Sequence, residues 1–340
     1  MIEVLKDETA PQWDAYVGAH PDGTVFHLSA WRHVLRDLGF DTYYLTACGT
    51  DGAITGVLPL AHVKSFLFGN HLVSLPYCVY AGPIADDQDC LKALVARATE
   101  LAEELQVSDV EFRAQASLAC DLPQKDLYAT FRRELPEGED AMMAAIPRKQ
   151  RAMVRKGIKA GLESAVTRDL TDFYPIYAES VRNLGTPVFA KRYFESLLRH
   201  FEDAADILMV RAPSGEFIAG VLSLYYKNEV LPYYGGSLFA ARALKGNDFM
   251  YWELMRHAAA RGITSFDFGR SKVGTGPYSF KKNWGFEPIP LPYQYLLMRG
   301  DDIPQVNPTN PKFALMISVW KRLPLPVANF LGPLVSKNLG

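Results

Sequence analysis

The chain has 340 residues, and an internal repeat limits its possible folds more than any other feature. Seven segments occur in the same order in both halves, at an offset of roughly 160 residues. The clearest pairs are 54–60 with 218–224 and 23–26 with 185–189. Such agreement predicts a duplicated unit, so we expect two domains of one fold joined in tandem.

Each half mixes strand and helix patterns. Apolar residues at helical spacing predict a helix over 86–105, behind an acidic start that suits a helix N-terminus. Alternating apolar residues predict strands, which we expect at 43–47, 54–64, 71–80 and 107–113, with a hairpin turn at 66–70. The fold class that follows is α+β, or mixed-sheet α/β, in both halves.

The two halves differ in charge. Residues 1–147 contain 10 Lys and Arg against 22 Asp and Glu, a net charge of −12. The remainder contains 26 against 16, a net charge of +10. This contrast indicates different roles for the halves, or attraction between them, rather than drift in surface charge.

A basic segment joins the halves. Pro147 suits the first turn of a helix, and six cations follow over 148–159. Arg148, Arg151 and Arg155 recur at i+3 and i+4, so they share one helix face. Two interpretations stay open: a solvated linker helix, or a surface that binds the phosphates of nucleic acid, a nucleotide-sugar or anionic lipid.

Chemically versatile side chains gather near the end of the second half. A short apolar strand over 263–268 carries Asp267, and the ends of such strands are where open α/β sheets bind ligands. Asp267 is a candidate proton acceptor, or it only holds Arg270 or a backbone loop. After the strand, cations stand among aromatic residues; those that could reach a substrate are Arg270, Ser271, Lys272, Tyr278, Lys281 and Lys282.

This block has a plainer interpretation as a charged loop and a short helix that packs its aromatic side chains. Core packing is the expected role of Trp284. The corresponding part of the first half, 111–116, lacks the glycine loop and the Lys-rich block. We therefore place the chemistry in the second half, at Lys281 and its neighbours, where a cation could stabilise developing negative charge.

The segment after Arg299 is rich in proline and contains two short helical patterns, at 312–322 and 326–338. Their apolar residues need burial, either on the protein's own surface or at a membrane. In the second case Lys312, Lys321, Arg322 and Lys337 would face lipid headgroups.

Composition excludes several classes of protein. The four cysteines form no CxxC pair and no cluster with metal-ligand spacing, which predicts reduced thiols and a cytosolic protein without a metal site. The N-terminus lacks a signal-peptide pattern, and no apolar run approaches the ~20 residues of a membrane span.

Several motifs of the second half are similar to those of a GNAT acyltransferase unit. They are Tyr-Tyr-Gly-Gly at 233–236, the loop 242–248 that opens a helix containing Trp252, and Phe-Asp-Phe-Gly at 266–269. Two such units joined by a basic helix, with Phe280-Lys281 and Trp284-Gly285, resemble the FemAB family. More narrowly, the chain resembles FemAB-related proteins associated with PEP-CTERM/exosortase systems and exopolysaccharide gene clusters.

The resemblance implies a fold and an activity. It implies tandem GNAT-like domains at 1–145 and 146–300, with the tail 301–340 folded back on the first domain. It implies transfer of an aminoacyl group from aminoacyl-tRNA to an amine of a peptidoglycan precursor, in a groove between the domains, with Lys281 at the donor end. Further residues expected to bind substrate or donor are Tyr234, Asn183, Thr186, Arg242 and Asn247.

The donor is a co-substrate, and no tightly bound cofactor is expected. Acetyl-CoA is disfavoured, because the loop 242–247 has one glycine, and a lysine where a second glycine is usual. We thus expect an acyl- or aminoacyltransferase in the cytoplasm, at or near the inner membrane surface, acting on a cell-envelope or exopolysaccharide precursor. The alternatives are a CoA-dependent N-acyltransferase and a non-catalytic binding or assembly factor derived from a transferase.

Overall fold

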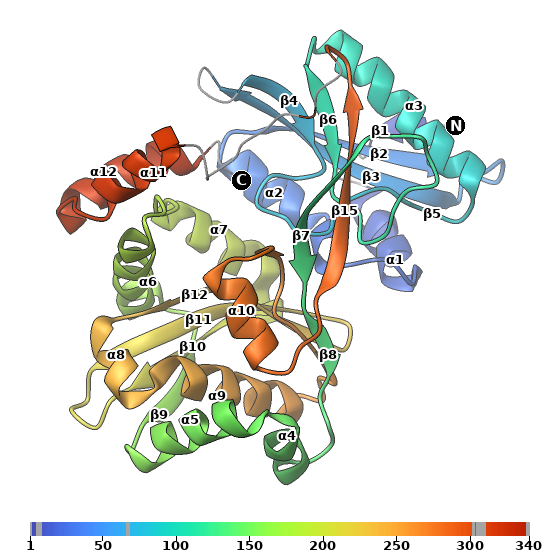
Figure 1. The fold of residues 1–340 in the computed structure, drawn as a ribbon. Coiled ribbons are helices and arrows are strands. Elements are labelled where there is room, and N and C mark those ends of the chain that lie inside the picture. Colours follow the sequence, from blue (N-terminus) through green and yellow to red (C-terminus); the bar gives the residue numbers. More distant parts are fainter. Residues whose placement is uncertain (1, 5–8, 66–68, 301–302, 304–310, 338–340) are drawn as a thin grey trace. The chain divides into compact units, whose positions relative to one another are not determined.

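The computed structural model describes residues 2–4, 9–65, 69–300, 303 and 311–337, without the side chains of 311–315 (Figure 1). The hairpin turn expected at 66–70 therefore lies partly outside the described residues, and so does the side chain of Lys312. The chain divides into two compact units. Unit 1 comprises 1–128, 290–306 and 337–340, and unit 2 comprises 129–289 and 307–336.

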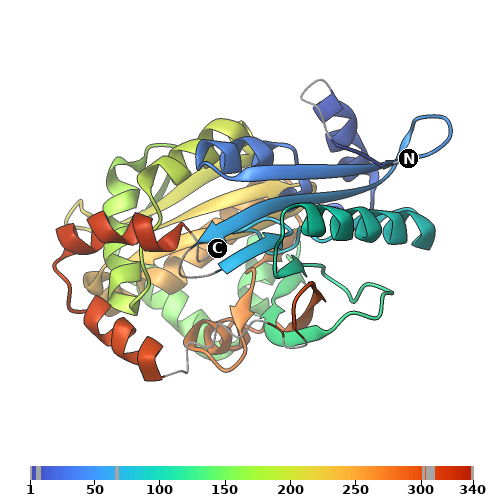
Figure 2. The same ribbon diagram turned by 90° about the horizontal axis from the view of Figure 1, so that it is seen from above.

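Unit 1 is a mixed sheet covered by helices. Its strands run in the order β1-β2-β3-β4-β6-β15-β7, and β5 pairs with β3. Helix α3, drawn in teal, runs alongside the strands of this sheet (Figure 2). It packs its apolar stripe of Leu94, Ala98 and Leu101 into the core, as its helical spacing predicts. The elements are β1 (Ile2–Val4), α1 (Ala10–Ala19), η2 (Val25–His27), α2 (Ala30–Asp37), β2 (Asp41–Cys48), β3 (Ile54–Ser65), β4 (Gly69–Val73), β5 (Ile84–Ala85), α3 (Gln88–Glu104), β6 (Asp109–Phe112), β7 (Gln124–Thr130, which ends in unit 2) and β15 (Ile289–Leu297).

Unit 2 has a second sheet, in the order β8-β13-β12-β11-β10-β9. Helices α5 and α9 lie on one face of this sheet, and α6 and α7 lie on the other (Figure 1). The elements are β8 (Arg132–Glu134), α4 (Glu139–Ala145), α5 (Arg148–Lys159), β9 (Glu163–Thr167), α6 (Leu170–Leu184), α7 (Lys191–Phe201), η3 (Glu202–Ala204), β10 (Ala205–Arg211), β11 (Phe217–Tyr226), β12 (Glu229–Ser237), α8 (Phe239–Leu244), α9 (Gly246–Ala260), β13 (Ser265–Asp267), β14 (Ser271–Lys272), α10 (Gly276–Asn283), α11 (Pro311–Trp320) and α12 (Leu325–Ser336).

The two units repeat one order of elements. In unit 1 the order is α1-α2-β2-β3-β4-α3-β6, and in unit 2 it is α6-α7-β10-β11-β12-α9-β13. The predicted duplication and the mixed α/β class are confirmed. The helices expected over 86–105 and 148–159 are confirmed as α3 and α5.

The halves exchange their last strands. Strand β15 ends the second repeat in sequence but pairs with β6 of unit 1, where Gln294 lies opposite Phe112. Strand β8 follows the first repeat but pairs with β13 of unit 2, where Arg133 lies opposite Phe266. Each sheet is therefore completed by a strand from the other half of the sequence, which the boundary expected at 145/146 does not anticipate.

One predicted strand is shorter than expected. The strand expected at 71–80 ends at Val73. Leu75 and Tyr77 have φ of 59° and 69°, a left-handed conformation that no strand can continue through. The Nη1 atom of Arg113 instead donates to the carbonyls of Leu75 and Cys78, at 3.2 and 2.9 Å, which fixes this irregular segment.

The tail also differs from the expectation that all of it packs on the first domain. Of the described residues of this tail, 303 and 337 belong to unit 1, but α11 and α12 belong to unit 2, where α12 packs on α6. Gly332 permits this close approach, because a Cβ atom there would lie 2.7 Å from Val188. The hydroxyl of Ser336 donates to the carbonyl of Val188 at 3.0 Å.

Candidate active site

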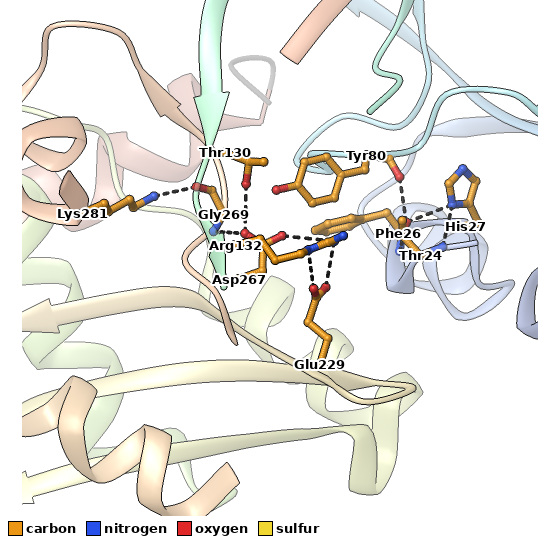
Figure 3. Close-up of polar contacts among 10 residues, drawn as sticks. All are labelled: Thr24, Phe26, His27, Tyr80, Thr130, Arg132, Glu229, Asp267, Gly269 and Lys281. Atoms are coloured by element: carbon orange, nitrogen blue, oxygen red, sulfur yellow. Dashed lines mark hydrogen bonds and ion pairs between the residues drawn. The ribbon is translucent and has the colours of Figure 1, made fainter. Parts of the chain in front are cut away.

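Asp267 ends β13 and is fully buried. Its Oδ1 atom accepts hydrogen bonds from the hydroxyl of Thr130, at 2.9 Å, and from the backbone N–H of Gly269, at 2.7 Å (Figure 3). The Nη2 atom of Arg132 lies 3.5 Å from Oδ2. Gly269 has a φ of 68°, which turns the chain directly after the strand and directs its N–H back to this carboxylate. Three donors from two strands and a turn thus hold one buried negative charge.

Glu229 lies beside this group at the start of β12. Its carboxylate is paired with Arg132, with Nε 2.5 Å from Oε2 and Nη2 3.1 Å from Oε1 (Figure 3). Burial, with the negative charge of Asp267 as a second cause, raises the pKa of Glu229 to about 8. One guanidinium therefore faces two carboxylates, and Glu229 can take up or release a proton near neutral pH.

Glu229 was not a candidate from the sequence. It follows the turn residues Lys227 and Asn228, so it had the pattern of an ordinary exposed hairpin residue. Only the pairing of β8 with β13 brings Arg132 to it. No local signal predicts this pairing, because β8 and β13 are about 130 residues apart in the chain.

Lys281 lies in α10 with its side chain almost completely buried. Its Nζ atom donates to the carbonyl of Gly269 at 2.8 Å (Figure 3) and to that of Arg270 at 3.2 Å. Burial lowers the pKa of Lys281 to about 7, although the charge of Asp267 acts in the opposite direction. The structure thus places the predicted catalytic lysine next to Asp267, joined to it through Gly269, and uses its amine to fix the turn after β13.

The depressed pKa of Lys281 predicts a pH-dependent contribution to stability. Between about pH 7 and 10.5 the unfolded chain holds a proton on this amine that the folded chain has released. Relative to a Lys281→Met variant, the wild type should therefore gain unfolding free energy as the pH rises through this range, by up to about 4 kcal/mol. Urea unfolding of both proteins at pH 6.5, 8 and 9.5 measures the difference; a constant or falling difference would contradict it.

The aromatic residues of this block mainly pack. Trp284 is fully buried in the core of unit 2, as expected. Tyr278 is half-buried, with its ring edge-on to Phe131 at 5.2 Å. Lys282 is exposed, with its Nζ 6.0 Å from the centre of the Tyr278 ring. The block therefore forms a short helix over the core that leaves one tyrosine edge and one lysine accessible.

Strands β12 and β13 diverge from each other. They run parallel but pair only at Glu229 with Ser265 and at Val230 with Phe266. The register of β12 against β11 shifts opposite Leu222 and Ser223, a bulge that precedes Tyr234. Among the paired residues that the structure describes, the rest of β12 has no strand on its β13 side.

Tyr234 lies in an aromatic cluster. Its hydroxyl is 2.9 Å from that of Tyr193. Its ring contacts those of Tyr177, Phe189 and Phe194 at centroid distances of 5.3 to 5.9 Å. This expected binding residue therefore has a packing role against α6 and α7.

Three of the expected donor-binding residues come together. Asn183, Arg242 and Asn247 line a pocket of about 150 Å³, together with Ser180, Leu184, Ser237 and Phe239. Lys245 lies between α8 and α9 with a φ of 62°, so it adopts the backbone conformation of a glycine. Asp248 lies in the first turn of α9, and burial raises its pKa.

The remaining expected residues are dispersed. Thr186 is exposed in the turn after α6 and does not line that pocket. Arg151 uses its guanidinium to bind the carbonyls of Ala144 and Ile146, at 2.8 and 3.0 Å, so it secures the end of α4. Arg148 and Arg155 are exposed on α5. Of the residues after the turn, Ser271 is buried, whereas Arg270 and Lys272 are half-exposed.

Unit 1 has a pocket of its own, of about 300 Å³. His27 lies in its wall, where Nδ1 accepts from the backbone N–H of Thr24 (Figure 3). Its Nε2 atom is 2.8 Å from the carbonyl oxygen of Gly82. Asp22 and Asp87 line the same pocket together with Arg113, and sequence reasoning did not locate these two carboxylates as a site.

The described residues contain neither a metal-binding cluster nor a membrane-spanning helix. Within the described ranges, no three His, Cys, Asp or Glu side chains are grouped so that they could hold a metal ion. None of the helices in the described part of the chain is both long and apolar enough to cross a membrane.

A protein-family model described as an acetyltransferase (GNAT) domain matches residues 148–282, within unit 2. A lipid II:glycine glycyltransferase of Staphylococcus epidermidis is 22% identical over 375 aligned residues, which span 82% of this chain and 88% of the relative. The protein is a transferase. The corresponding glycyltransferase of Staphylococcus aureus is 20% identical to this transferase, with the same coverage.

Solved structures share the fold of the transferase. FemX superimposes with a TM-score of 0.67 at 16% identity, covering 93% of this chain and all of FemX. L-PGS from Bacillus licheniformis has a TM-score of 0.57 at 15% identity, covering 94% of this chain and 99% of L-PGS. A tandem GNAT protein from the clavulanic acid biosynthesis pathway has a TM-score of 0.53 at 14% identity, covering 89% of this chain and 99% of that protein. The expected tandem GNAT-like fold is confirmed, and the resemblance to FemAB-like proteins is supported.

Proposed function

We propose that this transferase forms an amide on an amine of a cell-envelope precursor, with an aminoacyl donor bound by unit 2. The observation that carries the proposal is the group of Glu229, Arg132 and Asp267 beside the diverging strands β12 and β13. The names of the curated relatives support an acceptor of the lipid II class. An exopolysaccharide precursor and an association with PEP-CTERM/exosortase systems are narrower forms of the same proposal.

The proposed chemistry needs one base. The acceptor nitrogen attacks the carbonyl carbon of the aminoacyl ester, a C–N bond forms, and the ester C–O bond breaks. The amine loses a proton to the Glu229 carboxylate, and a proton is returned to the leaving oxygen of the donor. A carboxylate with a pKa of about 8 suits this exchange near neutral pH. In this proposal Asp267 and Lys281 hold Arg132 and the 269–270 turn in position. Tyr278 lies at the edge of the region where donor and acceptor react.

The donor is proposed to be aminoacyl-tRNA rather than acyl-CoA. The pocket at the start of α9 has about 150 Å³, below the ~300 Å³ at which ligand pockets usually begin. The carboxyl group of Asp248 in the first turn of α9 opposes a pyrophosphate there. The exposed Arg148 and Arg155 offer phosphate contacts on α5, which suits a polyanion.

Donor binding tests this proposal. Thermal unfolding of the transferase is followed with a stable aminoacyl-tRNA acceptor-stem analogue and, separately, with CoA. We expect stabilisation by the analogue. We also expect Arg148→Gln/Arg155→Gln to reduce the slope of log affinity against log salt by about 1.4, since each lost single-strand phosphate contact removes about 0.7.

The control for this change is Lys64→Gln/Lys92→Gln, which removes two exposed cations of unit 1. Its salt slope should equal that of the wild type. Stabilisation by CoA alone would overturn the donor assignment in favour of a CoA-dependent N-acyltransferase. If the arginine variant has the same slope of log affinity against log salt as the wild type, α5 is a solvated linker helix.

The acceptor is proposed to bind unit 1, and the protein to act in the cytoplasm at the inner membrane surface. Support for the first comes from the pocket of about 300 Å³, whose acidic residues Asp22 and Asp87 would attract an amine. The acidic start of α3 also makes this unit unsuited to a phosphate-rich donor.

A further inference from the structure

The two C-terminal helices have an unusual charge pattern. Between residues 311 and 340 the sequence contains no Asp or Glu, and its four cations are Lys312, Lys321, Arg322 and Lys337. Lys321 and Arg322 lie between α11 and α12 and are exposed. The Nη1 atom of Arg182 donates to the carbonyl of Lys321 at 3.3 Å, which holds this junction against α6.

Helix α12 places its small residues against the protein. Ala328, Gly332 and Ser336 recur at every fourth position and are buried. Gly332 lies so close to Val188 that a Cβ atom would be 2.7 Å from its Cγ1. The orientation of the helix about its axis is therefore fixed, because only this face can approach so closely.

The opposite face of α12 carries large apolar side chains into solvent. Phe330 is 74% exposed and Leu334 is 67% exposed. With Val327 and Leu331, which are also exposed, they follow the i, i+3, i+4, i+7 spacing of one helix face. This face is as apolar as a core-facing stripe, yet among the described residues of unit 2 none covers it.

Helix α11 repeats the arrangement. Ile317 packs at Gly185, where a Cβ atom would be 2.6 Å from its Cγ2. Met316 and Val319 are exposed, at 60% and 53%. Both helices thus turn their small or tightly packed residues inward and large apolar residues outward, next to two exposed cations.

We propose that the exposed apolar face of α11 and α12 binds the surface of an anionic membrane. The helices have 10 and 12 residues, about 15 and 18 Å long, too short for the ~30 Å hydrocarbon core. They would therefore lie in the interface, with Phe330 and Leu334 in the acyl boundary and Lys321 and Arg322 among anionic headgroups. The segment 311–340 contains cations but no acidic residues, so its charge is complementary to an anionic lipid surface. This charge favours lipid over a second copy of the chain.

This inference deepens the proposed function, because a lipid-linked acceptor is found at a membrane. Vesicle binding needs neither donor nor acceptor, so its result stands apart from any transfer assay. If the protein does not bind vesicles but transfers to a water-soluble acceptor, only the membrane proposal is contradicted. If it binds vesicles but shows no transfer, only the proposed transfer activity is contradicted.

The test is flotation of the full chain with vesicles of phosphatidylcholine alone and with 30% phosphatidylglycerol, about a third of the lipid as in many anionic membranes. We expect binding to the anionic vesicles and weak binding to the neutral ones. A Phe330→Ser/Leu334→Ser variant should bind the anionic vesicles with an affinity at least about tenfold lower than that of the wild type. A Lys321→Gln/Arg322→Gln variant should lose most of the preference for phosphatidylglycerol.

The matched control is Val166→Ser/Ile289→Ser, which removes two exposed apolar residues elsewhere and should leave binding unchanged. Circular dichroism and thermal unfolding check the fold of each variant, and Phe330→Ala alone is used if the double change unfolds α12. Wild-type protein that fails to float, or a double variant that floats like the wild type, would overturn the proposal. So would a dimer in sedimentation that the double variant abolishes without any vesicle binding, since a second copy would then cover this face.

Discussion

Replacing Glu229 by glutamine is expected to lower kcat/KM about 10²- to 10⁴-fold, the range in which a lost general base acts. Gln keeps the size of the side chain and one oxygen for Arg132, but it cannot accept the amine proton. The pKa of Glu229, raised to about 8 mainly by burial, also predicts that wild-type kcat/KM falls as the pH drops below about 8, because the base becomes protonated. Steady-state rates from pH 6 to 9.5 measure both effects.

The control for this variant is Asp206→Asn. Asp206 is also a buried carboxylate of unit 2, paired with Arg261 at 2.8 Å and bonded to the hydroxyl of Tyr225 at 3.0 Å, but it is not part of the Glu229 group. It should lower stability and leave the pH profile of kcat/KM unchanged. Full activity in Glu229→Gln, with the wild-type pH profile, would show that this carboxylate is not the base.

Replacing Lys281 by alanine is expected to lower the unfolding free energy by about 2–4 kcal/mol and to remove most of the activity. The amine satisfies the carbonyls of Gly269 and Arg270, and its removal leaves both without this donor and opens a cavity beneath α10. The turn whose N–H holds Asp267 would then relax, and Arg132 and Glu229 would lose their fixed position. Chemical denaturation and steady-state kinetics on the same preparations measure the two effects.

Lys282→Ala is the matched control, since the neighbouring lysine is exposed and its loss should change stability by less than about 0.5 kcal/mol. Lys281→Met separates packing from hydrogen bonding, because it refills the space without a donor. If Lys281→Ala folds with wild-type stability and activity, the amine has neither the structural nor the catalytic role. If only activity is lost, the amine acts on the reaction rather than on the turn.

Local pattern predicted most elements of this fold. The spacing of Leu94, Ala98 and Leu101 identified α3, and alternation identified β2 and β3, because amphipathic periodicity reflects which face each element buries. The repeat identified the duplicated architecture. The prediction of a strand over 71–80 was wrong beyond Val73. The left-handed conformations of Leu75 and Tyr77 end the strand, and they depend on the carbonyl contacts of Arg113.

The candidate site was predicted only in part. Asp267 and Lys281 were predicted to share a site because both belong to a dense local block, and both contact Gly269. Asn183, Arg242 and Asn247, which were expected to bind, line one pocket. The sequence did not show that Lys281 secures a turn.

By itself, then, the sequence determined the duplication, the class of the fold and the proximity of Asp267 and Lys281. Each of these follows from the spacing of residues along the chain. Only the tertiary structure decided that β8 and β15 each join the sheet formed mainly by the other half of the sequence, that Arg132 joins Glu229 to Asp267, and that α12 turns Phe330 outward. The physical reason is common to all three. Strand pairing, burial of charge and close helix packing depend on residues far apart in the chain, whose mutual positions no local pattern encodes.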